Sequence, residues 1–176
     1  YDVARDGVDA NGKFVAYLKN AYVDWNCKNR GLLSLGLIGT NSYGSQENTW
    51  GYRFIEKSPL DKNGFTNTAD LGIGYSHSFG NVNINAQIFN GEGYKSEHSH
   101  DNMATYLRVL YGESSLNKND GYNIGLVMTS SEGNNDDNSD DTNLMSLFGG
   151  WASNKLRLGL EYNQYETTDT EILMAV

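Results

Sequence analysis

Residues 69–90 read ADLGIGYSHSFGNVNINAQIFN, and apolar and polar side chains alternate along both halves of this stretch. The apolar positions of one face are Leu71, Ile73, Tyr75 and Phe79 in the first half and Val82, Ile84, Ala86 and Ile88 in the second. A period of two predicts β-strands, because a helix would repeat its apolar residues every three or four positions. Gly80 and Asn81 separate the halves, so the stretch predicts two strands joined by a tight turn.

The same alternation recurs along the rest of the chain. We predict eight strands, at residues 13–25, 30–40, 69–79, 82–90, 102–112, 121–131, 142–152 and 155–167. Their lengths exceed the five or six residues usual in soluble proteins and match the roughly 9–11 that a tilted strand needs to cross a bilayer. The composition agrees, since the 176 residues include 20 Gly and 12 Tyr but one Pro. The sequence therefore predicts an all-β, antiparallel up-and-down meander.

Short and long connections alternate between these strands. The short ones are 26–29, 80–81, 113–120 and 153–154, and the long ones are 41–68, 91–101 and 132–141. In a meander, alternate connections lie at opposite ends of the sheet. One end would carry tight turns and the other long loops, which is typical of transmembrane β-barrels of outer membranes.

The polar faces of the predicted strands hold mainly Gly, Ser, Asn and Gln, whereas a soluble exterior usually carries more charge. Aromatic residues gather near strand ends, as in the interfacial girdles of membrane barrels. These aromatic residues are Tyr22, Trp25, Trp50, Tyr52, Phe79, Phe89, Tyr111, Tyr122, Trp151 and Tyr165. We therefore expect the apolar faces to point outward to lipid and the polar faces to line a water-filled interior.

Several functional classes find no support. The net charge of −9, from 13 Lys+Arg and 22 Asp+Glu, lacks the basic face of a nucleic-acid binder. One cysteine, Cys27, cannot form an internal disulfide, and no apolar run approaches the ~18 residues of a membrane-spanning helix. No Gly-x-Ser-x-Gly or His-Glu-x-x-His motif is present, so we expect neither an enzyme nor a cofactor.

Two loops hold residues of the kind that bind metals. His98, His100 and Asp101 could ligate zinc or nickel, but no third anchored ligand is evident, so we expect an exposed loop and no metal site. Residues 132–141, EGNNDDNSDD, lack the spacing of an EF-hand. They predict a solvated acidic external loop, with a weak divalent bridge to lipopolysaccharide as the alternative.

Residues 50–75, WGYRFIEKSPLDKNGFTNTADLGIGY, resemble segments of Gram-negative outer-membrane porins in which a loop closes with ADLG and opens a strand. The resemblance implies a cofactor-free channel in the bacterial outer membrane for small hydrophilic solutes or ions, often a homotrimer. Porins have about 16–18 strands, so eight would be about half of a barrel. The chain begins at Tyr1 and ends in the apolar run 172–176, and we expect a fragment of a longer protein.

In porins the loop comparable to residues 41–68 folds into the lumen, so the resemblance implies a constriction element here. The residues expected to set its local field are Arg53, Glu56, Lys57, Asp61 and Lys62. A solvated external loop, or a short strand pair around 49–55, is the alternative.

Arg108, Arg157 and Glu161 fall on polar strand faces. An Arg facing lipid at the bilayer midplane costs roughly 2–4 kcal/mol, so these residues are predicted to line the pore and tune ion preference. Alternatively, they pair with one another and only hold the wall. The net charge of −9 suggests a preference for cations.

Two other architectures fit eight strands. One is a soluble or surface-exposed barrel that binds a small ligand in its interior, with its apolar faces pointing inward. The other is a small membrane barrel with a packed interior that does not conduct.

Overall fold

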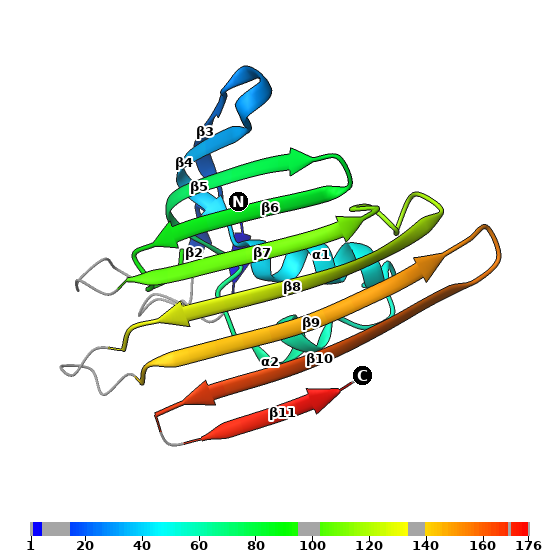
Figure 1. Ribbon diagram of the computed structural model, residues 1–176. Coiled ribbons are helices and arrows are strands. Elements are labelled where there is room, and N and C mark those ends of the chain that lie inside the picture. Colours follow the sequence, from blue (N-terminus) through cyan, green and yellow to red (C-terminus); the bar gives the residue numbers. More distant parts are fainter. Residues whose placement is uncertain (1, 5–14, 95–102, 134–139, 169, 176) are drawn as a thin grey trace.

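The computed structural model describes residues 2–4, 15–94, 103–133, 140–168 and 170–175. Nine strands form one antiparallel sheet in chain order, with β3 and β11 at its edges (Figure 1). They are β3 (Ala21–Asn26), β4 (Leu32–Gly39), β5 (Ala69–Phe79), β6 (Val82–Phe89), β7 (Ala104–Gly112), β8 (Gly121–Ser131), β9 (Thr142–Ala152), β10 (Arg157–Thr167) and β11 (Glu171–Ala175). The predicted all-β meander is confirmed, and the sheet is not closed.

The count of eight strands is wrong at the two ends of the chain. The predicted strand 13–25 is interrupted: β2 (Val15–Tyr17) pairs with β1 (Asp2–Ala4), and β3 joins the large sheet. Strand β11 was not predicted, because its apolar run shows no alternation. The other seven predicted strands agree with β4–β10 to within two residues at each end.

The connections sort by length to the two ends of the sheet. Residues 27–31, which include the short helix η1 (Lys28–Arg30), lie at the turn end with residues 80–81, 113–120 and 153–156. The strand ends that flank the connections 40–68, 90–103 and 132–141 lie at the other end, which we call the loop end (Figure 1). The ends of β10 and β11 that flank the short connection 168–170 lie there too.

Two helices occupy much of the 41–68 connection. Helix α1 (Asn41–Trp50) ends at Gly51, whose φ of 70° is left-handed and whose N–H donates to Glu47 O. Helix α2 (Pro59–Asn63) has proline at its first position and ends at Gly64. The alternative of a strand pair around 49–55 is therefore wrong. The side chains that α1 buries are mainly polar, so no apolar period marked this helix in the sequence.

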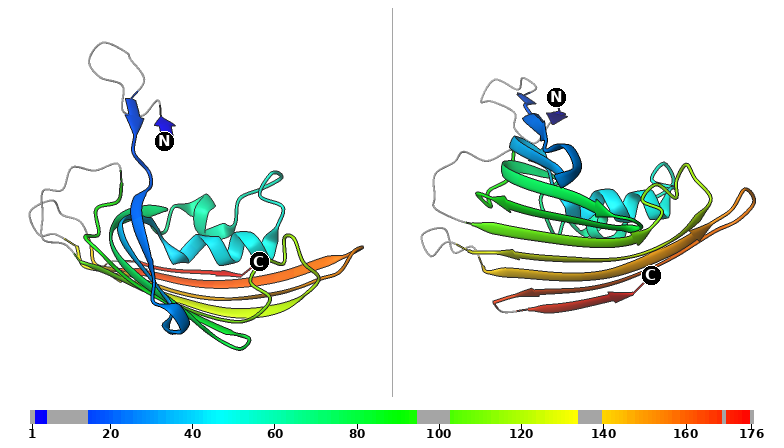
Figure 2. Two further views of the ribbon diagram at one scale, coloured as in Figure 1. Left: turned by 90° about the horizontal axis from the view of Figure 1, so that it is seen from above. Right: turned by 45° about the horizontal axis from the view of Figure 1, so that its top comes forward.

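Both helices lie against the concave face of the curved sheet (Figure 2). A small apolar cluster of Tyr43, Leu60 and Leu144 joins α1, α2 and β9, and Phe65 packs against it. Burial raises the pKa of Tyr43, whose hydroxyl donates to Thr66 O. Within the described residues, no helix is long and apolar enough to span a membrane.

Candidate functional site

The convex face of the sheet is mainly apolar, whereas the concave face combines polar residues with buried apolar ones. Leu156 (53% exposed), Leu158 (58%) and Leu160 (78%) belong to the convex face, which none of the described elements covers (Figure 2). Polar side chains of the concave face are buried, and Ser146 and Asn163 are 0% exposed. A sheet in water normally shows the reverse arrangement. The apolar residues predicted to share a face do so on the convex side of the described strands, and their contact with lipid stays a prediction.

Exposed and partly exposed apolar residues of β4–β10 form a band that crosses the convex face obliquely. We call it the apolar band. It runs through Leu33, Leu35 and Leu37 on β4, Leu71, Ile73, Tyr75 and Phe79 on β5, Val82, Ile84 and Ile88 on β6, Leu107, Val109 and Tyr111 on β7, Tyr122, Ile124, Leu126 and Met128 on β8, Met145, Leu147 and Trp151 on β9, and Leu158, Leu160 and Tyr162 on β10.

Strand register measures the slope of the apolar band. At the loop-end edge of the band, Leu37 of β4 pairs with Leu71 of β5. On β10 the same edge is formed by Tyr162, which the pairing of successive strands aligns with His77 of β5. The edge of the band therefore shifts by six residues along the strands, from position 71 to position 77, across the six strand-to-strand steps from β4 to β10. With about 3.4 Å per residue and about 4.8 Å between strands, the strands tilt by about 35° from the normal to the band.

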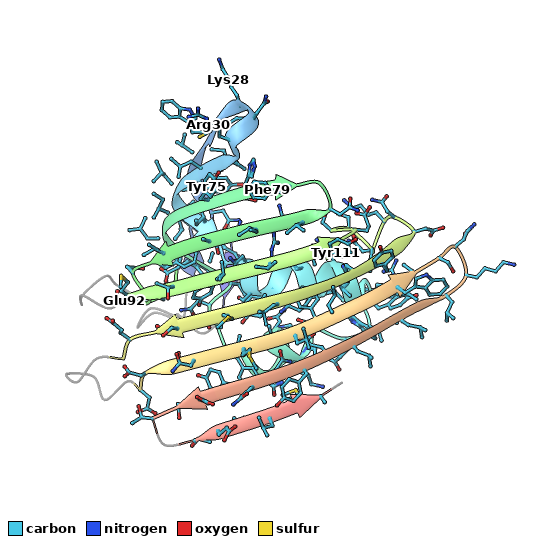
Figure 3. The ribbon with its side chains drawn as sticks, viewed as in Figure 1. Lys28, Arg30, Tyr75, Phe79, Glu92 and Tyr111 are labelled. Carbon is cyan, nitrogen blue, oxygen red and sulfur yellow. The ribbon has the colours of Figure 1, made fainter. Side chains whose placement is uncertain are left out.

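Aromatic side chains mark the turn-end edge of this band. Trp25, Phe79, Tyr111, Tyr122 and Trp151 are all exposed there, and the Tyr111 and Tyr122 ring centroids are 6.2 Å apart. Figure 3 labels Phe79 and Tyr111 among them. Aromatic residues therefore gather at one edge of the band, and a role at a membrane interface stays a prediction.

Other aromatic residues predicted for the girdles lie elsewhere. Phe89 is buried on the concave side, with its ring centroid 5.2 Å from that of Tyr106. Tyr165 stacks on Phe65 at 4.6 Å. Both residues lie near strand ends, as predicted, but their side chains are on the concave face of the sheet.

Hydrogen bonds between polar groups attach α1 to the concave face. At its start, Asn41 N–H donates to Gln87 Oε1 at 2.7 Å and Asn41 Nδ2 donates to Asn85 Oδ1 at 2.8 Å. Further along, Asn123 Nδ2 donates to Thr49 Oγ1 at 2.9 Å. The amides and hydroxyls of this interface were visible in sequence, but not that a helix would cover them.

Gly150 of β9 lets the end of α1 approach the sheet. A Cβ added there would lie 2.6 Å from Thr49 Cγ2 and 3.0 Å from Leu158 O. The first contact is too short for non-bonded heavy atoms and the second is tight, so a side chain at this position would force Thr49 to move. The helix therefore crosses the polar face in direct contact with it.

The residues predicted for the constriction come together beside α1. Arg53 donates to Glu47 Oε1 at 2.7 Å and also to Asp61, while Lys57 Nζ lies 3.5 Å from Asp61 Oδ1. The bond to Asp61 and the nearby carboxylate of Glu47 raise the pKa of Arg53. A second pair joins Lys62 and Glu56 at 3.2 Å.

The predicted wall charges lie apart from one another on the concave side. Arg108 of β7 donates to Ser45 Oγ at 2.7 Å and to Asn83. Arg157 of β10 donates to Leu116 O, and its guanidinium carbon lies 5.3 Å from the centroid of the Tyr52 ring. Glu161 accepts from Asn163 Nδ2 at 2.8 Å. In the described part of the chain these charges do not form ion pairs with one another, contrary to the wall-pairing alternative.

Two cavities flank α1. One of about 440 Å³ lies over β5–β7, is lined mainly by serine and asparagine, and has Arg108 as a lining residue. The other, of about 610 Å³, lies between α1, α2 and β10 and is lined by Glu56, Lys57, Lys62 and Glu161. Predicted site residues thus line both cavities. The first cavity has one cationic side chain, and the second has both cationic and anionic side chains.

The metal-binding alternatives lie largely outside the described residues. This holds for His98, His100 and Asp101, and for positions 134–139 of the acidic loop. Among the residues that the structure describes, no group of three or more His, Cys, Asp or Glu is placed to hold a metal.

The chain matches no protein-family model, and comparison with curated proteins and with solved structures finds no match. The resemblance to porins therefore depends on the sequence pattern alone.

Proposed function

We propose that the protein forms the wall of a channel in a bacterial outer membrane, through which small hydrophilic solutes or ions diffuse passively. The observation that carries the proposal is the oblique apolar band. In a sheet whose two faces are both in water, exposed apolar residues are not expected to form an oblique band. A membrane cuts tilted strands along a plane, and the tilt of about 35° lies within the roughly 35–45° of transmembrane strands.

The polar concave face supplies the second argument. Amides, hydroxyls and a few charges would line the water-filled side, and α1 would occupy part of that space. The cavities beside α1, of about 440 and 610 Å³, are the spaces through which solutes would pass. Arg108 in one and Glu161 in the other would act on permeating ions. No cofactor is required, because solutes move down their own gradients.

The ligand-binding barrel is the less supported function. It requires apolar faces that point inward, whereas the apolar band is on the convex, uncovered face. Assembly as a homotrimer and preference for cations both stay predictions.

Cysteine accessibility tests the proposed function. With Cys27→Ser as the background, one variant carries Asn48→Cys at the 440 Å³ cavity and a matched variant carries Leu107→Cys in the apolar band. In planar bilayers, a charged methanethiosulfonate that cannot enter membranes should modify position 48 and lower the conductance. Position 107 should react only after denaturation, because hydrocarbon excludes the reagent.

The two outcomes that contradict the proposal are distinct. Equal reaction rates at positions 48 and 107 in the folded protein would place both faces in water. Absence of any conductance in the unmodified protein would exclude an open channel.

A further inference from the structure

Two cations occupy the turn that joins β3 to β4. Lys28 and Arg30 are both exposed, and neither forms an ion pair with another described residue. Cys27 N–H donates to Gly31 O at 2.9 Å and closes the turn. The Tyr75 hydroxyl donates to Arg30 O, which fixes the turn to the convex face. The backbone that carries both cations is therefore held at the turn end of the apolar band, and we call this pair the basic corner.

Lys28 has an unusual backbone conformation. Its φ is +58°, and it is the one non-glycine residue with a positive φ among those that the structure describes. Glycine and asparagine adopt this left-handed conformation at lower cost than lysine. Residues held in such conformations cluster at functional sites. The conformation therefore favours a use for the lysine charge at this position.

One acidic residue lies close to the basic corner in sequence. It is Asp24 of β3, the only acidic residue between positions 21 and 40. Its carboxylate accepts from Ser34 Oγ at 2.5 Å, and the two residues are register partners. The next pair, Trp25 with Leu33, is on the convex face, so Asp24 is on the concave face. Even with Asp24 counted, two cations and one carboxylate leave a net charge of +1.

The neighbouring connections do not cancel this charge. The turn 80–81 carries no charged residue. Connection 113–120 has a net charge of −1, from Glu113, Lys118 and Asp120, but it is four strand spacings away. At about 4.8 Å per spacing this is about 19 Å along the sheet, well beyond the ~8 Å over which physiological salt screens exposed charges. The basic corner therefore presents a positive charge to its surroundings.

Aromatic side chains lie next to the basic corner on the convex face. Trp25, Tyr75 and Phe79 are all exposed. Figure 3 shows Lys28 and Arg30 next to Tyr75 and Phe79. Exposed aromatic rings favour the depth of lipid headgroups. A phosphate group at that depth would meet both cations.

We propose that the basic corner binds the headgroup phosphate of an anionic phospholipid. The planar guanidinium of Arg30 suits two phosphate oxygens, and Lys28 adds a second positive charge. The upper part of the acyl chains would pack on Trp25 and Phe79. Tight turns of membrane barrels are on the periplasmic side, away from lipopolysaccharide, so the occupant is a phospholipid. The inference rests on the proposed function, because it needs the convex face in lipid.

Quenching by brominated lipids tests the inference. The full chain is prepared with Trp25 as its only tryptophan, through Trp50→Phe and Trp151→Phe, and is reconstituted in phosphatidylcholine vesicles. Part of the lipid is replaced by chain-brominated phosphatidylglycerol or, in parallel, by chain-brominated phosphatidylcholine. The anionic lipid should quench Trp25 with an association constant about tenfold higher, because each cation at a membrane surface contributes about fivefold and Asp24 offsets part of it.

Substitutions at the basic corner separate its charge from its structure. Lys28→Asn should lower the ratio of association constants about threefold without lowering the midpoint of thermal unfolding, because asparagine tolerates the left-handed backbone. Arg30→Gln should lower the ratio similarly, whereas Arg30→Lys should retain most of it. Lys28→Asn and Arg30→Gln together should bring the ratio close to one. The matched control is Lys118→Asn, which removes a distant lysine of the turn end and should leave the ratio unchanged.

A second reporter distinguishes the possible failures. It retains Trp151 alone, through Trp25→Phe and Trp50→Phe. Lys155 in the adjacent turn is offset by the net charge of −1 in connection 113–120, so the ratio at Trp151 should be close to one.

A ratio close to one at Trp25, or one that the double substitution leaves unchanged, overturns the inference, while quenching of both reporters upholds the membrane proposal. Quenching at position 151 but not at 25 means that protein covers the basic corner, which also overturns the inference. Absence of quenching at both positions overturns both proposals.

Discussion

The convex and concave faces of one sheet show how the same strands serve two environments. Neighbouring residues on each strand face opposite ways, so Leu147 is exposed on the convex face while Ser146 is fully buried beneath α1. The convex face is mainly apolar and is not covered by any element that the structure describes, and its apolar residues form the oblique band. The concave face buries amides and hydroxyls, some of which hydrogen-bond to α1, together with apolar residues such as Leu110, Val127 and Phe148.

The difference shows that burial does not separate polar from apolar side chains here, because the concave face buries both kinds. On the concave face, polar groups can be buried because partners such as Asn41 and Gln87 satisfy one another. On the convex face, apolar groups are exposed in the isolated chain and would be covered only by a partner of equal polarity. The predictions below test whether the two faces really have different surroundings.

The largest expected effect concerns a charge in the apolar band. Leu147→Arg in vesicles should lower the free energy of unfolding by about 2–4 kcal/mol, because the guanidinium would face hydrocarbon. The control is Ser130→Arg, on the same face but beyond the loop-end edge of the band, with an expected cost of about 0–1 kcal/mol. Denaturant titration monitored by tryptophan fluorescence measures both. Equal small losses would place the convex face in water.

The next effect concerns the concave side at the end of α1. Gly51 has φ +70°, and a Cβ there would lie 1.5 Å from Arg157 Nη1, whereas Gly64 has φ +65° with open space around it. Gly64→Ala should cost about 1–2 kcal/mol from left-handed strain alone. Gly51→Ala should cost about 1 kcal/mol more, because Arg157 must leave its hydrogen-bond acceptor. Thermal unfolding compares them, and equal costs would contradict the observed contact.

A smaller effect is expected from the ion pairs that hold residues 51–62. Arg53→Ala removes a cation shared by Glu47 and Asp61, two carboxylates that are largely shielded from solvent, and should cost about 1 kcal/mol. Lys62→Ala breaks the exposed pair with Glu56 and should cost less than about 0.5 kcal/mol. If the segment narrows a pore, Arg53→Ala should also raise single-channel conductance, while Lys62→Ala leaves it nearly unchanged. The opposite ranking would remove Arg53 from the proposed constriction.

The smallest effect is on ion selectivity rather than stability. Arg108→Gln should shift the permeability ratio toward cations and Glu161→Gln should shift it toward anions. Each shift should reach about fivefold at most, because a unit charge a few ångströms from an ion in water is worth about 1 kcal/mol. Reversal potentials in salt gradients measure the ratio. Shifts in the same direction for both variants would show that the concave charges do not act on permeating ions.

Much of the sheet could be predicted because its signal is local. In residues 69–90 the alternation identifies both strands, and Gly80 and Asn81 mark the turn to within one residue. Arg108, Arg157 and Glu161 stood out in the sequence because charges are rare on polar strand faces, and their role in a pore wall stays a prediction. The helices were missed, because α1 buries Ser42, Ser45 and Gln46, which show no apolar period.

The sequence by itself determined the strand alternation, and with it which residues share a face, because successive side chains of a strand point to opposite sides. Only the tertiary structure decided how those faces are used. The register of seven strands aligned separate apolar triplets and quartets into one oblique band, and residues 41–68 folded back so that Asn41 and Thr49 meet Asn85 and Asn123. These contacts join positions far apart in the chain, so no local pattern could encode them.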